Sequence, residues 1–200
     1  MQILKTTQKP KNVHIPTKEE VAEERERLKH KKEYNRVLRS TIYALLVVAA
    51  IAVLIATQFL PVLQVSGSSM EPTLADEDII LLAKTNSFQT GELCGFYWQN
   101  KLLLKRIIGT PGDIIDIKED GTVFVNGEEI EEPYVSEKAL GECDLTFPYQ
   151  VPENRYFVMG DHRTVSIDSR SSVIGCVEKE QIIGKVIMRI WPLSELSIIH

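Results

Sequence analysis

The sequence predicts a mostly β protein, in which an antiparallel, barrel-like sheet domain follows one N-terminal transmembrane helix. Residues 40–70 contain no charged side chain. The most apolar part of this run, residues 42–60, is close in length to the ~20 helical residues that span a bilayer core. After residue 75, short strand-like segments follow one another with no helical pattern between them. This arrangement favours an antiparallel β domain.

Charge divides the chain at the apolar run. Residues 1–40 carry 11 Lys or Arg against 6 Glu, whereas the rest carries 12 basic against 22 acidic residues. Positive flanks of a membrane helix stay in the cytoplasm. We therefore predict a cytoplasmic segment at 1–39, a single-pass plasma-membrane anchor at 40–63 and an extracytoplasmic domain at 64–200. A cleaved signal peptide fits less well, because its apolar region is only about 7–15 residues long and lies near the N-terminus.

The cytoplasmic segment is expected to begin as a flexible polar tail and to continue as a charged helix. Thr17 and Glu20, after Pro16, form the pattern of a helix capping box. The charged stretch at 19–39 then runs into the anchor. Because its basic residues are interleaved with Glu beside a lipid bilayer, we expect a solvated helix that helps to set topology, and no nucleic-acid partner.

The β domain is predicted from its apolar runs and its turns. Asp120-Gly121 and Asn126-Gly127 stand between strand-like runs and are strong hairpin signals. The expected strands are 78–83, 93–98, 102–108, 114–118, 122–125, 128–130, 156–159, 182–190 and 196–199.

The three cysteines, Cys94, Cys143 and Cys176, argue against a full disulfide framework because their number is odd. One bridge stays open, and its pair is not determined by spacing. No cysteine or histidine spacing suggests zinc. We expect buried or free thiols and no metal site.

Ser69 is the first candidate for chemistry, because it lies in a turn just beyond the predicted anchor. Gly67 permits unusual backbone angles beside it, and Pro72 stiffens the turn. A serine nucleophile needs a base within hydrogen-bond reach. The chain has no G-x-S-x-G sequence, so the hydrolase nucleophile elbow does not apply.

One histidine remains as a base on topological grounds. His14 and His30 precede the anchor, and His200 ends the chain. A Ser-His-Asp triad that uses His162 stays open, beside the plainer interpretation of His162 as a polar loop residue.

Lys105 is the alternative base. Strand alternation puts it on the same face as Leu103 and Ile107. Burial there would lower the pKa of the lysine, and a neutral lysine can take a proton from a serine. The alternative is an edge-strand lysine with its amine in water.

A third cluster lies at 160–170. Asp168 and Arg170 could pair and brace a loop, and Ser166 could bond to a neighbouring active-site group. Taken alone, this segment is an ordinary polar turn.

Together these segments resemble the ordered motifs of the type I signal peptidases. They are Ser-Met-x-Pro-Thr-Leu at 69–74, Lys-Arg-Ile-Ile-Gly-Thr-Pro-Gly-Asp at 105–113, and Gly-Asp-x-Arg-x-x-Ser-x-Asp-Ser-Arg at 160–170. The segments at 183–186 and 189–192 are also similar, so that the resemblance covers nearly all of residues 40–193.

The resemblance implies a Ser/Lys peptidase that cuts signal peptides from exported preproteins at the outer membrane face, without metal or cofactor. By position, Ser69 would be the nucleophile and Lys105 the general base. Ser166 would hydrogen-bond to the lysine, and Asp168 with Arg170 would form a supporting salt bridge. The substrate pockets would be lined by Val65, Met70, Leu74 and Leu104.

The sequence departs from the family pattern at few positions. Some relatives supply an oxyanion donor from a serine two residues before the nucleophile, where this chain has Gly67. His162 replaces a frequent Asn, and Thr164-Val165 replaces Asp-Asn. The short domain resembles the compact bacterial members of the family.

Two other functions stay open on the sequence. A membrane-anchored β domain could bind a partner without cutting it. A self-cleaving repressor uses similar Ser/Lys chemistry, but it carries a DNA-binding helical domain where this chain has a membrane span. The sequence leaves the oligomeric state undetermined.

Overall fold

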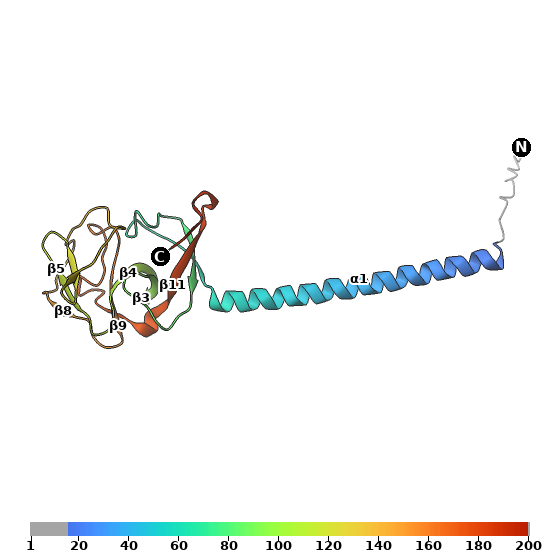
Figure 1. Ribbon diagram of the computed structural model, residues 1–200, viewed down its shortest axis with the longest axis horizontal. Helices are drawn as coiled ribbons and strands as arrows, with labels where there is room; N and C mark the ends of the chain where they lie inside the picture. Colours follow the sequence, from blue (N-terminus) through green and yellow to red (C-terminus); the bar gives the residue numbers. More distant parts are fainter. Residues whose placement is uncertain (1–15, 200) are drawn as a thin grey trace, which may run out of the picture. The chain divides into compact units, whose positions relative to one another are not determined.

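The structure of the protein, a computed structural model, describes residues 16–199. The predicted tail lies almost wholly outside these residues, as do His14 and His200. The chain forms two compact units, Met1–Leu54 and Ile55–His200. The elements are labelled in Figure 1.

The one α-helix among residues 16–199, α1 (Lys18–Phe59), contains 42 residues, or about 63 Å of length at 1.5 Å per residue. Its start has the predicted capping box, because Thr17 N donates to Glu20 Oε2 at 2.8 Å and Glu20 N to Thr17 Oγ1 at 3.3 Å. Its most apolar window has a mean hydropathy of 2.4, enough by length and composition to cross a membrane.

The helix ends before the predicted anchor does. Pro61 lacks an N–H and disfavours helical geometry in the residue before it, so the helix stops at Phe59. The strand β1 (Val62–Gln64) begins directly afterwards and pairs with β2. The last residues of the predicted anchor, at 62–63, therefore belong to the β-sheet.

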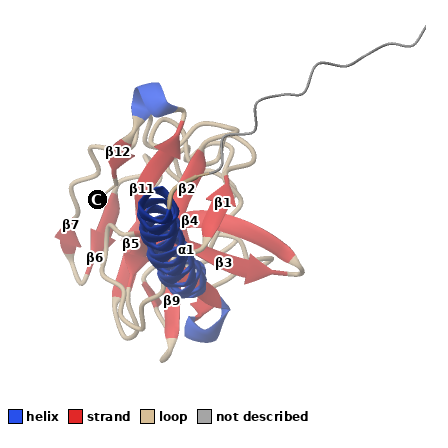
Figure 2. Ribbon diagram, turned by 90° about the vertical axis from the view of Figure 1, so that its right-hand side faces the viewer, coloured by secondary structure: helices blue, strands red, loops and turns tan. Residues whose placement is uncertain are grey.

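The β unit contains two antiparallel sheets, which confirms the predicted mostly β class (Figure 2). The larger sheet runs in the order β1-β2-β11-β3-β4-β9-β10, and β12 also pairs with β11. Its other strands are β2 (Ile79–Ala83), β3 (Leu93–Trp98), β4 (Lys101–Gly109), β9 (Arg155–Met159), β10 (Val177–Glu178), β11 (Ile182–Trp191) and β12 (Ser197–Ile198). The order runs from β1 to β10, so β4 lies inside the sheet, between β3 and β9.

The smaller sheet has the order β7-β6-β5-β8. Its strands are β5 (Ile114–Ile117), β6 (Val123–Val125), β7 (Glu128–Glu129) and β8 (Tyr149–Gln150). Two short 3-10 helices, η1 (Lys179–Gln181) and η2 (Leu193–Glu195), flank β11. The nine predicted strands are present, whereas β1, β8 and β10 were not predicted. Each of these three has only two or three residues, too few to give a periodic signal.

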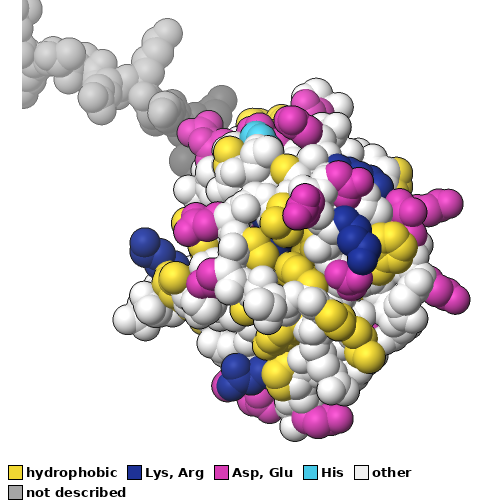
Figure 3. Space-filling view, turned by 90° about the vertical axis from the view of Figure 1, so that its left-hand side faces the viewer, with side chains coloured by type: hydrophobic (Ala, Val, Ile, Leu, Met, Phe, Trp, Pro, Cys, Tyr) yellow, Lys and Arg dark blue, Asp and Glu magenta, His cyan; other side chains and the backbone are white. Residues whose placement is uncertain are grey.

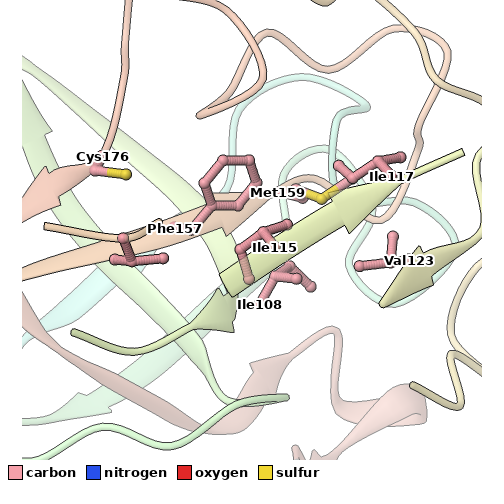
Figure 4. Close-up of a cluster of buried hydrophobic side chains, with 8 residues drawn as sticks. Ile108, Ile115, Ile117, Val123, Phe157, Met159 and Cys176 are labelled. Atoms are coloured by element: carbon pink, nitrogen blue, oxygen red, sulfur yellow. The ribbon is translucent and has the colours of Figure 1, made fainter. Parts of the chain in front are cut away.

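Three apolar clusters form the core. The cluster in Figure 4 joins the two sheets, since Ile108 of β4 and Phe157 of β9 pack with Ile115 of β5. A second cluster lies under the segment that carries Ser69 and contains Val65, Met70, Leu74, Ile80, Leu82, Leu93 and Val186. A third packs around Cys94 and Ile107. On the face shown in Figure 3, hydrophobic side chains form a strip that has both acidic and basic side chains around it.

The cluster between the sheets yields a stability prediction. Ile115→Ala removes a fully buried side chain, and we expect it to lower the free energy of unfolding by about 2–5 kcal/mol. Ile114→Ala is the matched control, because Ile114 is the preceding residue of β5 and is 45% exposed. Urea unfolding followed by tryptophan fluorescence measures both. Equal losses would show that Ile115 is not part of a packed core.

Candidate active site

Ser69 lies in a tightly held turn between β1 and β2. Val65 N donates to Asp78 O at 2.8 Å and Glu77 N to Val65 O at 3.1 Å, which closes the segment at its base. Within it, Leu74 N donates to Met70 O at 2.9 Å. The backbone N–H of His162 donates to Ser69 O at 3.1 Å, so the serine turn is tied directly to the 160–170 loop.

Lys105 reaches this turn from the sheet. Its Nζ atom lies 2.7 Å from Ser69 Oγ, within hydrogen-bond distance. The lysine is only 4% exposed, and its strand, β4, is hydrogen-bonded on both sides. The interpretation as an edge-strand lysine with a solvated amine is therefore wrong.

The surroundings of Lys105 favour its neutral form. Burial lowers the pKa of the Lys105 amine below its ordinary value, because desolvation penalises the ammonium. The negative charge of Asp168 acts in the opposite direction, and the positive charge of Arg170 adds to the lowering. A lysine in this state can accept a proton from the hydroxyl that it touches.

Asp168 and Arg170 form the expected salt bridge. The guanidinium donates from Nε to Oδ1 at 2.8 Å and from Nη2 to Oδ2 at 2.9 Å, and both side chains are fully buried. Asp168 Oδ2 also accepts from Gly160 N at 2.9 Å, while Arg170 Nη1 donates to Leu140 O at 2.7 Å. The pair thus connects three stretches of chain around the end of β9.

Ser166 is close to the site but does not make the expected bond to the lysine. Its Oγ atom is buried and has no hydrogen-bond partner among the described residues. The hydroxyl packs instead over Gly160, where an added Cβ would lie 2.2 Å from Ser166 Oγ and 2.6 Å from Ser69 O. The predicted hydrogen bond to the lysine is therefore not formed among the described residues.

His162 does not reach the serine hydroxyl as a base. Its Nδ1 atom lies 3.2 Å from the carbonyl oxygen of Ser68, whereas Ser69 Oγ is bonded to Lys105. The geometry therefore favours the lysine over the Ser-His-Asp arrangement.

A small cleft opens beside Ser69. Of the four predicted pocket residues, Val65, Met70 and Leu104 line it, whereas Leu74 is fully buried in the cluster beneath. The cleft volume of about 80 Å³ is well below the roughly 300–1,000 Å³ of pockets that hold drug-sized ligands. The cleft has room only for small side chains. Its remaining lining comes from Leu63, Gln64, Ser66, Gly67, Ser69, Leu102, Leu103 and Lys105.

A second buried ion pair, not predicted from the sequence, lies on the other face of β4. Arg106 donates to Asp161 from Nε at 2.9 Å and from Nη2 at 2.7 Å. Thr73 Oγ1 donates to Asp161 Oδ2 at 2.5 Å, and the guanidinium lies 3.7 Å from the centre of the Tyr134 ring. Strand alternation placed Arg106 opposite Lys105, but nothing in the sequence identified its partner, 55 residues away.

Two further contacts around the site were not predicted from the sequence. Arg163 pairs with Glu132, and both side chains are fully buried. Gly67, at φ +87°, donates its N–H to Asp76 Oδ1 at 2.8 Å. Since Gly67 lines the cleft, Asp76 fixes one wall of it.

The three cysteines are free thiols, so none of the bridges left open by the sequence is formed. Cys94 is fully buried and pairs in register with Lys105. Burial raises the pKa of the Cys94 thiol to about 12, an effect that the nearby lysine partly offsets. Cys94 is therefore a protonated neighbour of the lysine.

A serine next to a buried lysine in a β domain is one of the arrangements that serine peptidases use. Residues 38–191 match the family described as signal peptidase, peptidase S26. The chain therefore belongs to this family of serine peptidases, whose members remove signal peptides.

Two named relatives agree with this assignment by sequence. Signal peptidase I of Bacillus amyloliquefaciens is 35% identical over 164 residues, covering 76% of this chain and 88% of that protein. Signal peptidase I U of Bacillus subtilis strain 168 is 33% identical over 177 residues, covering 82% and 94%. A solved structure of signal peptidase I from Enterococcus faecalis V583 is 28% identical, with a TM-score of 0.41, and covers 50% of this chain and 96% of that one.

The bond between Gly67 and Asp76 yields a prediction about activity. Asp76→Ala frees the cleft wall, and we expect kcat/KM for preprotein cleavage to fall by about tenfold, the scale of one exposed charge-assisted hydrogen bond. Asp76→Asn keeps an acceptor and should retain most of the activity.

Asp120→Ala is the control for that experiment. Asp120 also accepts a backbone N–H, from Thr122, but in the turn between β5 and β6. If Asp76→Ala and Asp120→Ala had the same kcat/KM, Asp76 would have no role in holding the cleft.

Proposed function

We propose that this chain cuts exported preproteins after an Ala-x-Ala-like site, with Ser69 as nucleophile and neutral Lys105 as general base. The observation that carries the proposal is the 2.7 Å contact between Lys105 Nζ and Ser69 Oγ inside a buried environment. Nucleophilic catalysis needs such a base within hydrogen-bond reach.

The reaction follows from these two groups. Lys105 takes the Ser69 proton as the oxygen attacks the scissile carbonyl, and the resulting ammonium returns a proton to the leaving amine. The acyl-enzyme on Ser69 then remains. Lys105, neutral again, deprotonates a water molecule that attacks the ester and releases the signal peptide.

Ser166, Asp168 and Arg170 are proposed to support the lysine. Within residues 16–199, Ser166 Oγ is a buried acceptor without a hydrogen-bond partner, so it is available when the lysine becomes an ammonium with three donors. The salt bridge between Asp168 and Arg170 holds the loop that carries Ser166. All three act by positioning and do not touch the scissile bond.

The proposed oxyanion donor is the Ser69 backbone N–H, which makes no hydrogen bond within residues 16–199. Gly67 cannot supply the second donor, because it has no side chain and its N–H is bound to Asp76. A donor aimed at the developing oxyanion contributes roughly 2.7–4 kcal/mol in comparable enzymes. Ser66 and Ser68 are the adjacent hydroxyls.

Substrate selection is proposed to combine an edge strand with the small cleft. In the part of the chain that the structure describes, β1 is paired on one side only, by β2, and residues 63–65 line the cleft. An extended peptide can add to such an edge and place alternate side chains in adjoining pockets. Val65, Met70 and Leu104 would then reject large side chains by overlap, and Leu74 would support Met70 from beneath.

The proposed location is the outer face of the plasma membrane, with helix α1 as a single-pass anchor. Its apolar window and the basic residues before it favour a cytoplasmic N-terminus. Enzyme and preprotein would then diffuse in the same membrane, which brings the cleavage site to Ser69. The partners are exported preproteins and the bilayer.

The direct test is cleavage of a preprotein with an Ala-x-Ala site by the detergent-solubilised full chain. We expect Ser69→Ala, Lys105→Ala and Lys105→Arg each to lose at least about a thousandfold in kcat, because the nucleophile or the neutral base is missing. Product sequencing should place the cut directly after the small-residue site.

Cys94→Ala is the control variant for this test, because it changes the residue opposite Lys105 without touching the proposed reacting atoms. Cleavage by both Ser69→Ala and Lys105→Ala would remove the proposed pair and make His162 the next candidate. A folded wild type that binds preproteins without cutting them would favour the binding-domain alternative.

The lowered pKa of Lys105 predicts the pH profile. Below that pKa the lysine is charged and cannot accept a proton, so kcat/KM should fall tenfold per pH unit on the acidic side. Since the pKa of Lys105 lies below the ordinary 10.5, activity should level off below that pH. A peptide substrate without ionisable groups isolates the enzyme's titration. A profile that still climbs steeply at pH 10.5 would contradict a desolvated base.

A further inference from the structure

The N-terminal half of helix α1 carries its positive charge on one face. Five basic residues are spaced alternately four and three positions apart, which aligns them along one side of an α-helix. They are Arg25, Lys29, Lys32, Arg36 and Arg39, and we call them the basic stripe. All five are exposed.

Acidic residues lie on a neighbouring face of the same helix. Glu19, Glu23 and Glu26 follow the same four-and-three spacing, and Glu33 continues their line one heptad after Glu26. Residues 18–39 contain eight basic and six acidic residues, so total charge alone would give a nearly neutral segment. The separation of the two signs is what creates a cationic surface.

The basic stripe is not neutralised within the helix. Among the described residues, none of its five members forms an ion pair, whereas Arg27, which lies off the stripe, pairs with Glu24 at 3.5 Å. The stripe therefore presents unpaired guanidinium and ammonium groups along about 21 Å of helix, at 1.5 Å per residue.

A shallow groove along this face has the donors that a phosphate group needs. It is lined by Lys32, Asn35, Arg36, Arg39, Ser40 and Tyr43. Three cations, two hydroxyls and an amide can all donate to phosphate oxygens, and no carboxylate lines the groove. The groove ends where the apolar run begins, at the depth where tyrosine is enriched beside headgroups.

We infer that the membrane-proximal part of the basic stripe, Lys32, Arg36 and Arg39, binds the phosphate headgroups of anionic phospholipids in the leaflet beside it. This inference rests on the proposed anchoring by α1, which brings Arg36 and Arg39 to headgroup level. Basic clusters next to a membrane helix are attracted to anionic lipids. Orientation in the membrane depends on the number of positive charges in the flank and not on their face, so topology alone does not account for a stripe.

The test is binding of phosphatidylglycerol to the full chain in detergent, measured by native mass spectrometry. Lys32→Gln with Arg36→Gln removes two charges from the stripe, and we expect the apparent Kd to rise about fivefold or more. Arg27→Gln with Lys31→Gln removes the same charge from the far side of the helix and should change the Kd less than about twofold. For the wild type, salt at about 0.5 M should weaken the preference through screening.

Several results would overturn the inference. Equal losses in the two double variants would show that only net charge matters, and equal affinity for phosphatidylcholine would remove the preference for anionic lipid. A shift from dimer to monomer in the same spectra, without a change in bound lipid, would assign the stripe to a second copy of the chain. Failure of the proposed anchoring is distinguishable, because the protein would then stay monodisperse without detergent.

Discussion

Burial of an ionisable amine beside the nucleophile is the constraint on which the rest of the site depends. Desolvation favours the neutral lysine, but Asp168 and Asp161 both pull the pKa of Lys105 upward. Each of these carboxylates is paired bidentately with its own arginine, Arg170 for the first and Arg106 for the second. Each arginine thus offsets much of the negative charge that Lys105 would otherwise feel. Burial remains the largest influence on the pKa of Lys105.

The arginine pairs also set geometry. Buried ion pairs add little net stability, because desolvation offsets much of their attraction, but loss of one partner is costly. Here they connect segments that are distant in sequence: Arg106 holds the loop after β9 to β4, and Arg163 holds the same loop to Glu132. Arg170 binds the carbonyl of Leu140 as well. The loop is thereby fixed against the serine turn from three directions, which suits a site that needs close positioning.

The features that could be predicted from the sequence are those that a local residue pattern determines. The hairpins, the helix start at Thr17, and the placement of Lys105 in an apolar strand all follow from spacing and residue type. The contacts that could not be predicted are those between residues that only the folded chain brings together. Asp161 meets Arg106 only because β9 pairs with β4, and Asp76 meets Gly67 only because a turn folds back. Whether Ser166 Oγ contacts the lysine also depends on how its loop approaches β4, and among the described residues this hydroxyl has no hydrogen-bond partner.

Gly160 limits which segments of such an enzyme can be exchanged with those of a relative. Any side chain at this position would collide with both Ser166 and the Ser69 carbonyl. The close packing of the serine turn against the 160–170 loop therefore requires glycine at position 160. Neither segment can be grafted from a relative on its own unless the donor reproduces this fit. In segment-exchange experiments, and over evolutionary time, the serine turn and the 160–170 loop are expected to change together, although about 90 residues of chain separate them.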